Sequence, residues 1–169
     1  MSELTNAEKI LDILHKDCRI PLEQIADMLG EPIDTVAEEI SKMEEEGVIL
    51  GYGAKVNWDK AFGSEAVTAY IEIKVTPQRN QGFDRIAERI YQYPEVKAVN
   101  LMSGSYDFGI TVEGSNVKEI AQFVSDHLAP MDSVISTATH FVLTKYKDGG
   151  VVFADDYEEI DERGSNLCD

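Results

Sequence analysis

A chain of 169 residues, 43% of them hydrophobic, can form either one large domain or two small ones. Its two cysteines, Cys18 and Cys168, lie at opposite ends of the sequence, which argues against a disulfide framework and a cysteine-based zinc site. No stretch approaches the roughly 20 apolar residues of a membrane span, and no secretion signal is recognisable, so we expect a soluble cytoplasmic protein without membrane contact.

The formal net charge of −17 is unevenly distributed along the chain. Residues 1–60 carry a net charge of −8, residues 61–147 carry −2 and residues 148–169 carry −7. Proteins bind nucleic-acid phosphates mainly through Lys and Arg side chains. An acidic N-terminal segment is therefore unfavourable for nonspecific binding to nucleic acids.

The first predicted helix has a recognisable start signal. Thr5 and Glu8 have the spacing of a capping box, in which the threonine side chain accepts a hydrogen bond from the glutamate amide. The apolar residues that follow recur at helical spacing as far as about His15. We therefore expect a helix over these residues.

Two further helices are predicted before residue 48. The second begins at Pro21, a residue favoured in the first turn of helices, and stops at Gly30. The third begins near Pro32 and ends at Gly47, where a positive φ is cheap only for glycine. Three short helices with a tight turn between the last two predict a helix-turn-helix.

The next segment predicts the wing of a winged helix-turn-helix. Residues 48–50 and 52–56 are short β-prone runs joined by Gly51, so we expect two short strands. This sets the N-terminal domain at residues 1–56, and we interpret residues 57–64 as a linker.

Residues 65–147 have the pattern of an α+β domain. From Glu65 to Pro77, apolar and polar residues alternate strictly, which predicts a strand with one buried face. The following elements are predicted as a helix from Phe83 to before Pro94, strands at 96–102 and 106–113 around a turn at 103–105, a helix at 117–128 and a strand at 134–145. The order strand, helix, strand, strand, helix, strand is that of the ferredoxin-like βαββαβ fold.

Residues 148–169 form an acidic C-terminal tail whose sizeable apolar cluster is Val151 to Phe153. Two interpretations remain open. The tail is solvated and partly disordered, or its apolar cluster adds an edge strand to a neighbouring subunit.

The whole pattern resembles the Lrp/AsnC (feast/famine) family of prokaryotic regulators. The sequence landmarks are Asp17–Ile20, Met43–Ile49 followed by Gly51-Tyr52, Gly104–Asp107, and Thr137–Thr139 followed by Val142-Leu143. Their order and spacing cover about residues 4–147. The resemblance implies a winged helix-turn-helix, a ferredoxin-like (RAM-type) domain that senses an effector, usually an amino acid, and homo-oligomers that are dimers built on the sheets or octamers of four dimers. It implies no cofactor.

The resemblance also implies an effector site between subunits, at the central hairpin and the last strand. The predicted effector-binding set is Met102, Gly104, Tyr106, Asp107, Thr137 and Thr139. Glycine lets a backbone approach a ligand closely, the aspartate offers a carboxylate to an α-ammonium group, and the two threonines project hydroxyls from one strand face. A hairpin turn with ordinary β-prone threonines remains the alternative.

The recognition helix departs from the family pattern, which presents serine near its start and arginines one and two turns later. Here residues 32–34 are Pro-Ile-Asp, and Glu38 and Glu39 follow. A glutamate accepts only from cytosine N4 and repels phosphates. The side chains left to donate hydrogen bonds to DNA are Thr35, Ser41 and Lys42, which form the predicted DNA-binding set.

Two functional hypotheses follow. The first is a transcriptional regulator that binds double-stranded DNA and an amino-acid effector. The second is a ligand-sensing or protein-interaction module that has lost DNA binding, and the acidic recognition helix favours it. Enzymatic motifs such as HExxH, GxSxG and the P-loop are missing, and His15, His127 and His140 fall on separate elements without metal-type spacing, so we predict neither a catalytic nor a metal site.

Overall fold

The computed structural model describes residues 4–63, 66–76 and 82–153, and it divides the chain into two compact units, Met1–Lys55 and Val56–Asp169. The predictions made for Glu65, Pro77 and residues 154–169 lie outside the described residues. Each unit has its own hydrophobic core.

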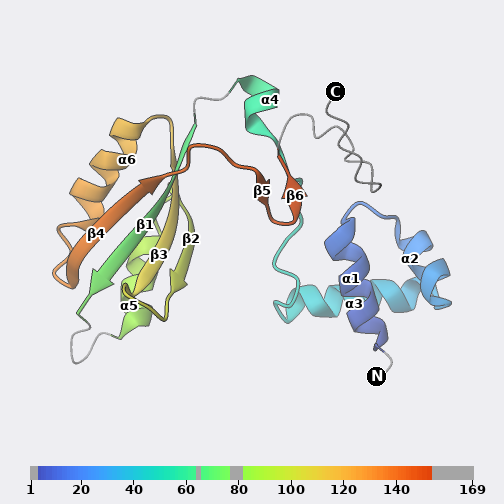
Figure 1. Ribbon diagram of the computed structural model, residues 1–169. Coiled ribbons are helices and arrows are strands. Elements are labelled where there is room, and N and C mark those ends of the chain that lie inside the picture. Colours follow the sequence, from blue (N-terminus) through green and yellow to red (C-terminus); the bar gives the residue numbers. More distant parts are fainter. Residues whose placement is uncertain (1–3, 64–65, 77–81, 154–169) are drawn as a thin grey trace, which may run out of the picture. The chain divides into compact units, whose positions relative to one another are not determined.

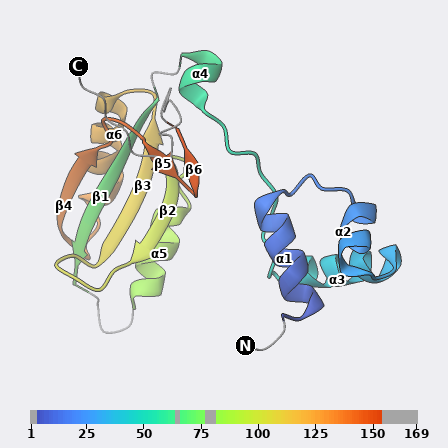
Figure 2. The same cartoon turned by 45° about the vertical axis from the view of Figure 1, so that its right-hand side comes forward.

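The first unit consists of three helices, α1 (Asn6–Lys16), α2 (Leu22–Leu29) and α3 (Ile33–Glu45) (Figure 2). The predicted capping box is present at the start of α1. The Thr5 hydroxyl accepts from the Glu8 amide at 3.3 Å, and the Glu8 carboxylate accepts from the Thr5 amide at 2.7 Å. The core between the helices is formed by Ile10, Ile25, Ala26, Val36 and Met43.

Glycines end the second and third helices as predicted. Gly30 has a φ of 69° and turns the chain between α2 and α3, and Gly47 has the same φ after α3. A residue with a Cβ is strained in this left-handed region. The helix-turn-helix geometry therefore depends on Gly30.

Residues 48–56 contain no strand, so the two short strands predicted for the wing are wrong. The backbone amides of Val48 and Ile49 both donate to the carbonyl of Met43, at 2.8 and 3.0 Å. These donors end α3 and are not available for a hairpin. Tyr52 is instead tied to α3, because its hydroxyl donates to the Glu44 carboxylate at 2.7 Å.

The interpretation of residues 57–64 as a plain linker is also incomplete. They include the short helix α4 (Trp58–Phe62). The Asn57 side chain accepts a hydrogen bond from the Lys60 amide at 3.1 Å, which is the usual action of an asparagine N-cap.

The second unit has the predicted ferredoxin-like order (Figure 1). Its elements are β1 (Val67–Val75), α5 (Phe83–Tyr91), β2 (Val96–Leu101), β3 (Phe108–Gly114), α6 (Val117–Phe123), the π-helical turn η1 (Val124–Leu128) and β4 (Val134–Phe141). The four strands form an antiparallel sheet in the order β2-β3-β1-β4. Each βαβ unit therefore contributes one central strand, β1 or β3, and one edge strand, β2 or β4, to the same sheet.

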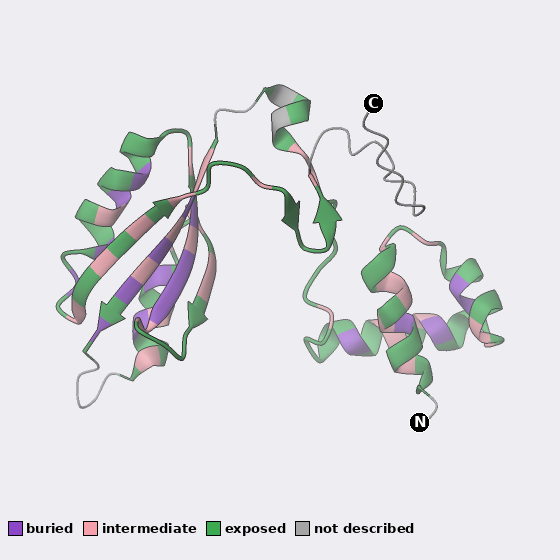
Figure 3. Cartoon of the chain, in the orientation of Figure 1, coloured by how far each residue is buried: buried purple, intermediate pink, exposed green. Residues whose placement is uncertain are grey.

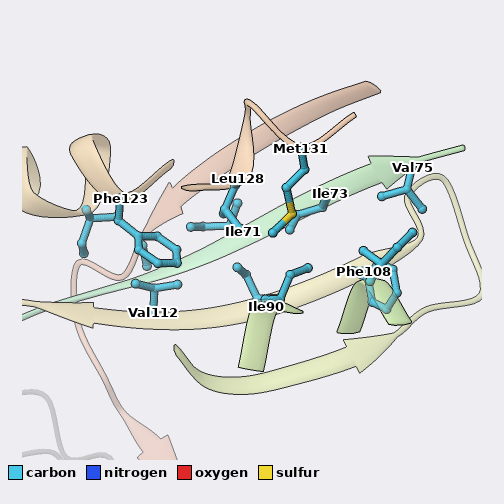
Figure 4. Close-up of a cluster of buried hydrophobic side chains, with 13 residues drawn as sticks. Ile71, Ile73, Val75, Ile90, Phe108, Val112, Phe123, Leu128 and Met131 are labelled. Atoms are coloured by element: carbon cyan, nitrogen blue, oxygen red, sulfur yellow. The ribbon is translucent and has the colours of Figure 1, made fainter. Parts of the chain in front are cut away.

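One face of this sheet is covered by α5 and α6 and contains the core (Figures 3 and 4). The alternation predicted for β1 is confirmed, because Ala69, Ile71, Ile73 and Val75 are buried. They pack with residues of both helices, such as Ile90 and Phe123. The opposite face, here called the open face, carries the intervening β1 residues Thr68, Tyr70, Glu72 and Lys74.

The described part of the acidic tail folds back on its own chain. β5 (Lys147–Asp148) pairs antiparallel with β6 (Val151–Val152) across Gly149 and Gly150. The expectation of disorder is therefore wrong for residues 148–153, whereas the expectation of solvent exposure is confirmed for residues 148–152. Val151 and Val152 pair here within the chain. Among the described helices, none has the length and apolar character needed to cross a membrane.

Candidate DNA-binding helix and effector site

The predicted DNA-binding residues lie on the solvent side of α3. Val36 and Met43 are buried in the core, whereas Thr35, Ser41 and Lys42 are exposed. Helical spacing places Thr35 and Lys42 together on one flank of the core-facing stripe and Ser41 on the other flank. All three belong to the solvent-exposed surface, which a recognition helix presents to the major groove.

The same side of α3 carries more acid than base. Asp34, Glu38 and Glu45 are exposed there beside the single lysine Lys42. On α1, the Lys16 ammonium group is 2.6 Å from the Asp12 carboxylate, so its charge is locally compensated. Of the two glutamates named from the sequence, Glu38 lies on this exposed side, whereas Glu39 is half-buried.

The hairpin between β2 and β3 contains four of the six predicted effector residues. Its ends are fixed by backbone hydrogen bonds: the Met102 amide donates to the Asp107 carbonyl at 2.8 Å, and the Asp107 amide donates to the Ile73 carbonyl at 3.0 Å. Gly104 is exposed, and a Cβ built on it would have no atom within 4 Å. The backbone around Gly104 is thus open to a ligand.

Asp107 has a structural hydrogen bond. Its carboxylate oxygen Oδ2 accepts from the amide of Val75 at 2.8 Å, at the position where the pairing of β1 with β4 shifts register. One oxygen of this carboxylate is therefore occupied within the chain. An α-ammonium group would have to bind the remaining acceptor positions.

Tyr106 is paired with a residue that the sequence analysis did not single out. Its hydroxyl is 2.9 Å from the hydroxyl of Tyr70, and the two rings meet edge to face with centroids 6.4 Å apart. This hydrogen bond raises the pKa of Tyr70 to about 12, with smaller contributions from burial and nearby negative charge. Tyr70 belongs to the open face, so Tyr106 is held on that face.

Thr137 and Thr139 share one face of β4, as predicted, but it is the helix-covered face. Thr137 pairs with Ile73 and Thr139 pairs with Ile71, and both isoleucines are fully buried. Directly paired residues point to the same side of a sheet. Within one chain, the threonines and Tyr106 therefore lie on opposite faces, and the structure does not bring all six predicted residues together.

The second unit contains a cavity of about 610 Å³ that no sequence motif indicated. It lies between α4, the start of β1 and the segment after β4. Its wall includes Trp58, Thr68, Glu113, Leu143, Tyr146 and Phe153, and none of the six predicted effector residues. Lys145 also lines it and is placed over the Phe153 ring, with 5.6 Å from Nζ to the ring centroid.

Family profiles match both units. Residues 4–49 match a winged helix-turn-helix DNA-binding domain, and residues 68–152 match an Lrp/AsnC ligand binding domain. The chain is 50% identical to the uncharacterised HTH-type transcriptional regulator YugG of Bacillus subtilis, over 89% of this chain and 92% of that protein.

Solved structures agree with the fold. The leucine response regulatory protein of Mycobacterium tuberculosis superposes with a TM-score of 0.73 at 19% identity and covers 87% of this chain and 97% of its own. A Neisseria meningitidis transcriptional regulator, solved as a complex with L-Met, superposes with a TM-score of 0.70 at 18% identity. The match covers 87% of this chain and 94% of that protein.

Proposed function

The chain belongs to the Lrp/AsnC family of transcriptional regulators, which is not a family of enzymes, and we propose that an amino-acid effector controls its binding to double-stranded DNA. DNA binds through α2 and α3. The effector binds at the hairpin between β2 and β3 and at β4, where subunits of a homo-oligomer meet.

The observation that carries the DNA-binding part is the helix-turn-helix itself. Gly30 turns the chain between α2 and α3, and the polar side of α3 is exposed while Val36 and Met43 hold the other side in the core. This leaves Thr35, Ser41 and Lys42 able to donate hydrogen bonds to bases or phosphates.

The acidic residues of α3 set the strength of this binding. Asp34 and Glu38 repel phosphates, so a single helix-turn-helix binds weakly. Several copies in one oligomer raise the effective affinity through avidity without any new contact. We therefore propose that DNA binding needs the assembled oligomer.

The effector part is supported by the open backbone at Gly104 and by the carboxylate of Asp107 beside it. Because Thr137 and Thr139 lie on the other face of the sheet from Tyr106, one ligand reaches both groups only where two chains meet. The Neisseria meningitidis relative was solved with L-Met, an α-amino acid with an ammonium and a carboxylate group.

The test uses the full chain in two assays. In the first, fluorescence anisotropy with duplex DNA at two salt concentrations should show saturable binding that weakens steeply with salt, and Lys42→Gln should weaken it further. In the second, a thermal-shift screen of the twenty amino acids should find a stabilising ligand, since a ligand at 100 times its Kd stabilises a fold by about 2.7 kcal/mol.

The outcomes separate the two parts of the proposal. An absence of DNA binding with and without each amino acid would contradict the DNA-binding part and support a sensor that has lost it. A flat thermal-shift screen would contradict the effector part. DNA binding that does not respond to a stabilising amino acid would contradict control by that effector.

A further inference from the structure

Tyr70 of β1 contacts two residues of the neighbouring hairpin, Tyr106 before β3 and Gly109 within β3. Its hydroxyl is 2.9 Å from that of Tyr106. A Cβ built on Gly109 would lie 1.9 Å from the Tyr70 hydroxyl oxygen and 2.7 Å from its Cζ. The phenol of Tyr70 therefore lies over the backbone of Gly109, on the open face of the sheet.

The backbone does not require glycine at position 109. Gly109 sits in the middle of the sheet, paired with Glu72 of β1 and Asn100 of β2, and its φ is outside the left-handed region. Glycine within a strand weakens it unless another group approaches closely. The close approach of the Tyr70 ring is the structural reason for a glycine here.

The hairpin that carries Tyr106 has few other restraints. Residues 102–105 are exposed, whereas Tyr106 and Asp107 are half-buried. The Asp107 carboxylate fixes the end of the hairpin, because it accepts a hydrogen bond from the Val75 amide. The Tyr106 side chain is oriented by its hydrogen bond and edge-to-face ring contact with Tyr70.

We propose that Tyr70 and Gly109 are positioning residues for the effector-binding hairpin. Tyr70 orients Tyr106, and Gly109 leaves the space in which the Tyr70 ring lies. Neither residue contacts the effector, and both act through Tyr106. This inference rests on the proposed function, because it assigns a role within the same effector site.

The first arm of the test detects the contact without any effector. The hydrogen bond with Tyr106 raises the pKa of Tyr70 to about 12, and the bond with Glu44 does the same for Tyr52. In a pH-jump measurement of tyrosinate absorbance, recorded before the protein unfolds, Tyr70 and Tyr52 should both ionise at a higher pH than an ordinary tyrosine. Tyr106→Phe should return the Tyr70 pKa toward its usual value of 10 and leave Tyr52 unchanged as an internal reference.

Gly109→Ala should have the same effect on the titration. The added methyl group meets the far end of a flexible side chain, so the ring can move away while the fold is kept. The matched control is Gly82→Ala, because a Cβ at this glycine of the same unit would have no atom within 4 Å. If Gly109→Ala and Tyr106→Phe both leave the late ionisation of Tyr70 unchanged, the proposed contact is overturned.

The second arm measures effector binding, with the amino acid that gives the largest thermal shift to the unmodified chain. Tyr70→Phe removes only the hydroxyl, and we expect it to weaken binding roughly three- to tenfold, the range of a single net hydrogen bond. Gly109→Ala should weaken binding similarly. The double variant should be little worse than either single variant, because both break the same contact.

Two controls separate positioning from loss of stability. Tyr91→Phe removes the hydroxyl of an exposed tyrosine, and Ile120→Val lowers stability from within the core. Both should keep the original affinity. If Tyr70→Phe binds as tightly as Tyr91→Phe, this inference is overturned and the effector site stands; if no amino acid binds the unmodified chain, the effector proposal fails and takes this inference with it.

Discussion

The carboxylate of Asp107 accepts a hydrogen bond from the backbone N–H of Val75 at 2.8 Å, and this bond joins the β2–β3 hairpin to the irregular end of β1. Asp107→Ala leaves this part-buried amide without its acceptor, so we expect a loss of about 1–3 kcal/mol in the free energy of unfolding. Asp107→Asn keeps an acceptor oxygen and should retain most of the stability. Urea unfolding of the three proteins measures this difference.

The same pair of variants separates structure from ligand binding. Asp107→Asn removes the charge that the proposed effector site offers to an ammonium group, so it should weaken effector binding while the fold remains stable. Equal effector affinity in Asp107→Asn and the unmodified chain would show that the carboxylate charge has no part in the site.

The capping box at the start of α1 predicts a local stability effect. Thr5→Ala removes the acceptor of the Glu8 amide and should lower the stability of the first unit by about 1 kcal/mol. Thr5→Ser keeps the hydroxyl and is the control. Thermal unfolding followed by far-ultraviolet circular dichroism measures both, and an alanine variant as stable as the serine variant would contradict a functional cap.

The acidity of α3 predicts that removing one carboxylate improves DNA binding. Glu38→Gln should tighten binding to duplex DNA about two- to fivefold, because it removes an exposed like charge near phosphate. The control is Glu88→Gln, which removes the same charge from the exposed side of α5 in the other unit. Anisotropy titrations at low salt should separate the two variants; identical affinities would mean that this side of α3 does not face DNA.

Glu119 predicts a pH-dependent contribution to stability. Hydrogen bonds from the hydroxyl and amide of Ser115 hold the pKa of Glu119 below its usual value of 4.5. Because the folded pKa is lower than the unfolded one, the stabilisation is present above pH 4.5 and is lost as the pH falls through the folded pKa.

Urea unfolding of Glu119→Gln tests this direction. The variant should be less stable than the unmodified chain at neutral pH, and the difference should shrink on acidification below pH 4.5. Glu88→Gln again serves as the matched control. A difference that grows as the pH falls would contradict the assigned direction.

The fold was predictable where a local signal and the tertiary environment agree. Strict alternation along residues 67–75 identifies β1 because the sheet is covered on one side only. The missing strands at residues 48–56 were not predictable, because the β-prone residues Val48 and Ile49 use their amides to end α3. Propensity does not record this competition between helix capping and strand pairing.

The candidate site was predictable only as a set of residues. Spacing places Thr137 and Thr139 on one face of a strand, but the face itself depends on the register with β1, which a single sequence does not contain. Tyr70 was missed for a similar reason. It occupies an ordinary polar position of an alternating strand, and its partner Tyr106 is 36 residues away.

The place of the Tyr70 ring over Gly109 also constrains how this sequence can diverge. A side chain cannot appear at position 109 while an aromatic residue occupies position 70, unless that ring turns away from the hairpin. Homologues should therefore show correlated substitution at these two positions, with the tyrosine exchanged for a smaller residue before, or together with, the glycine.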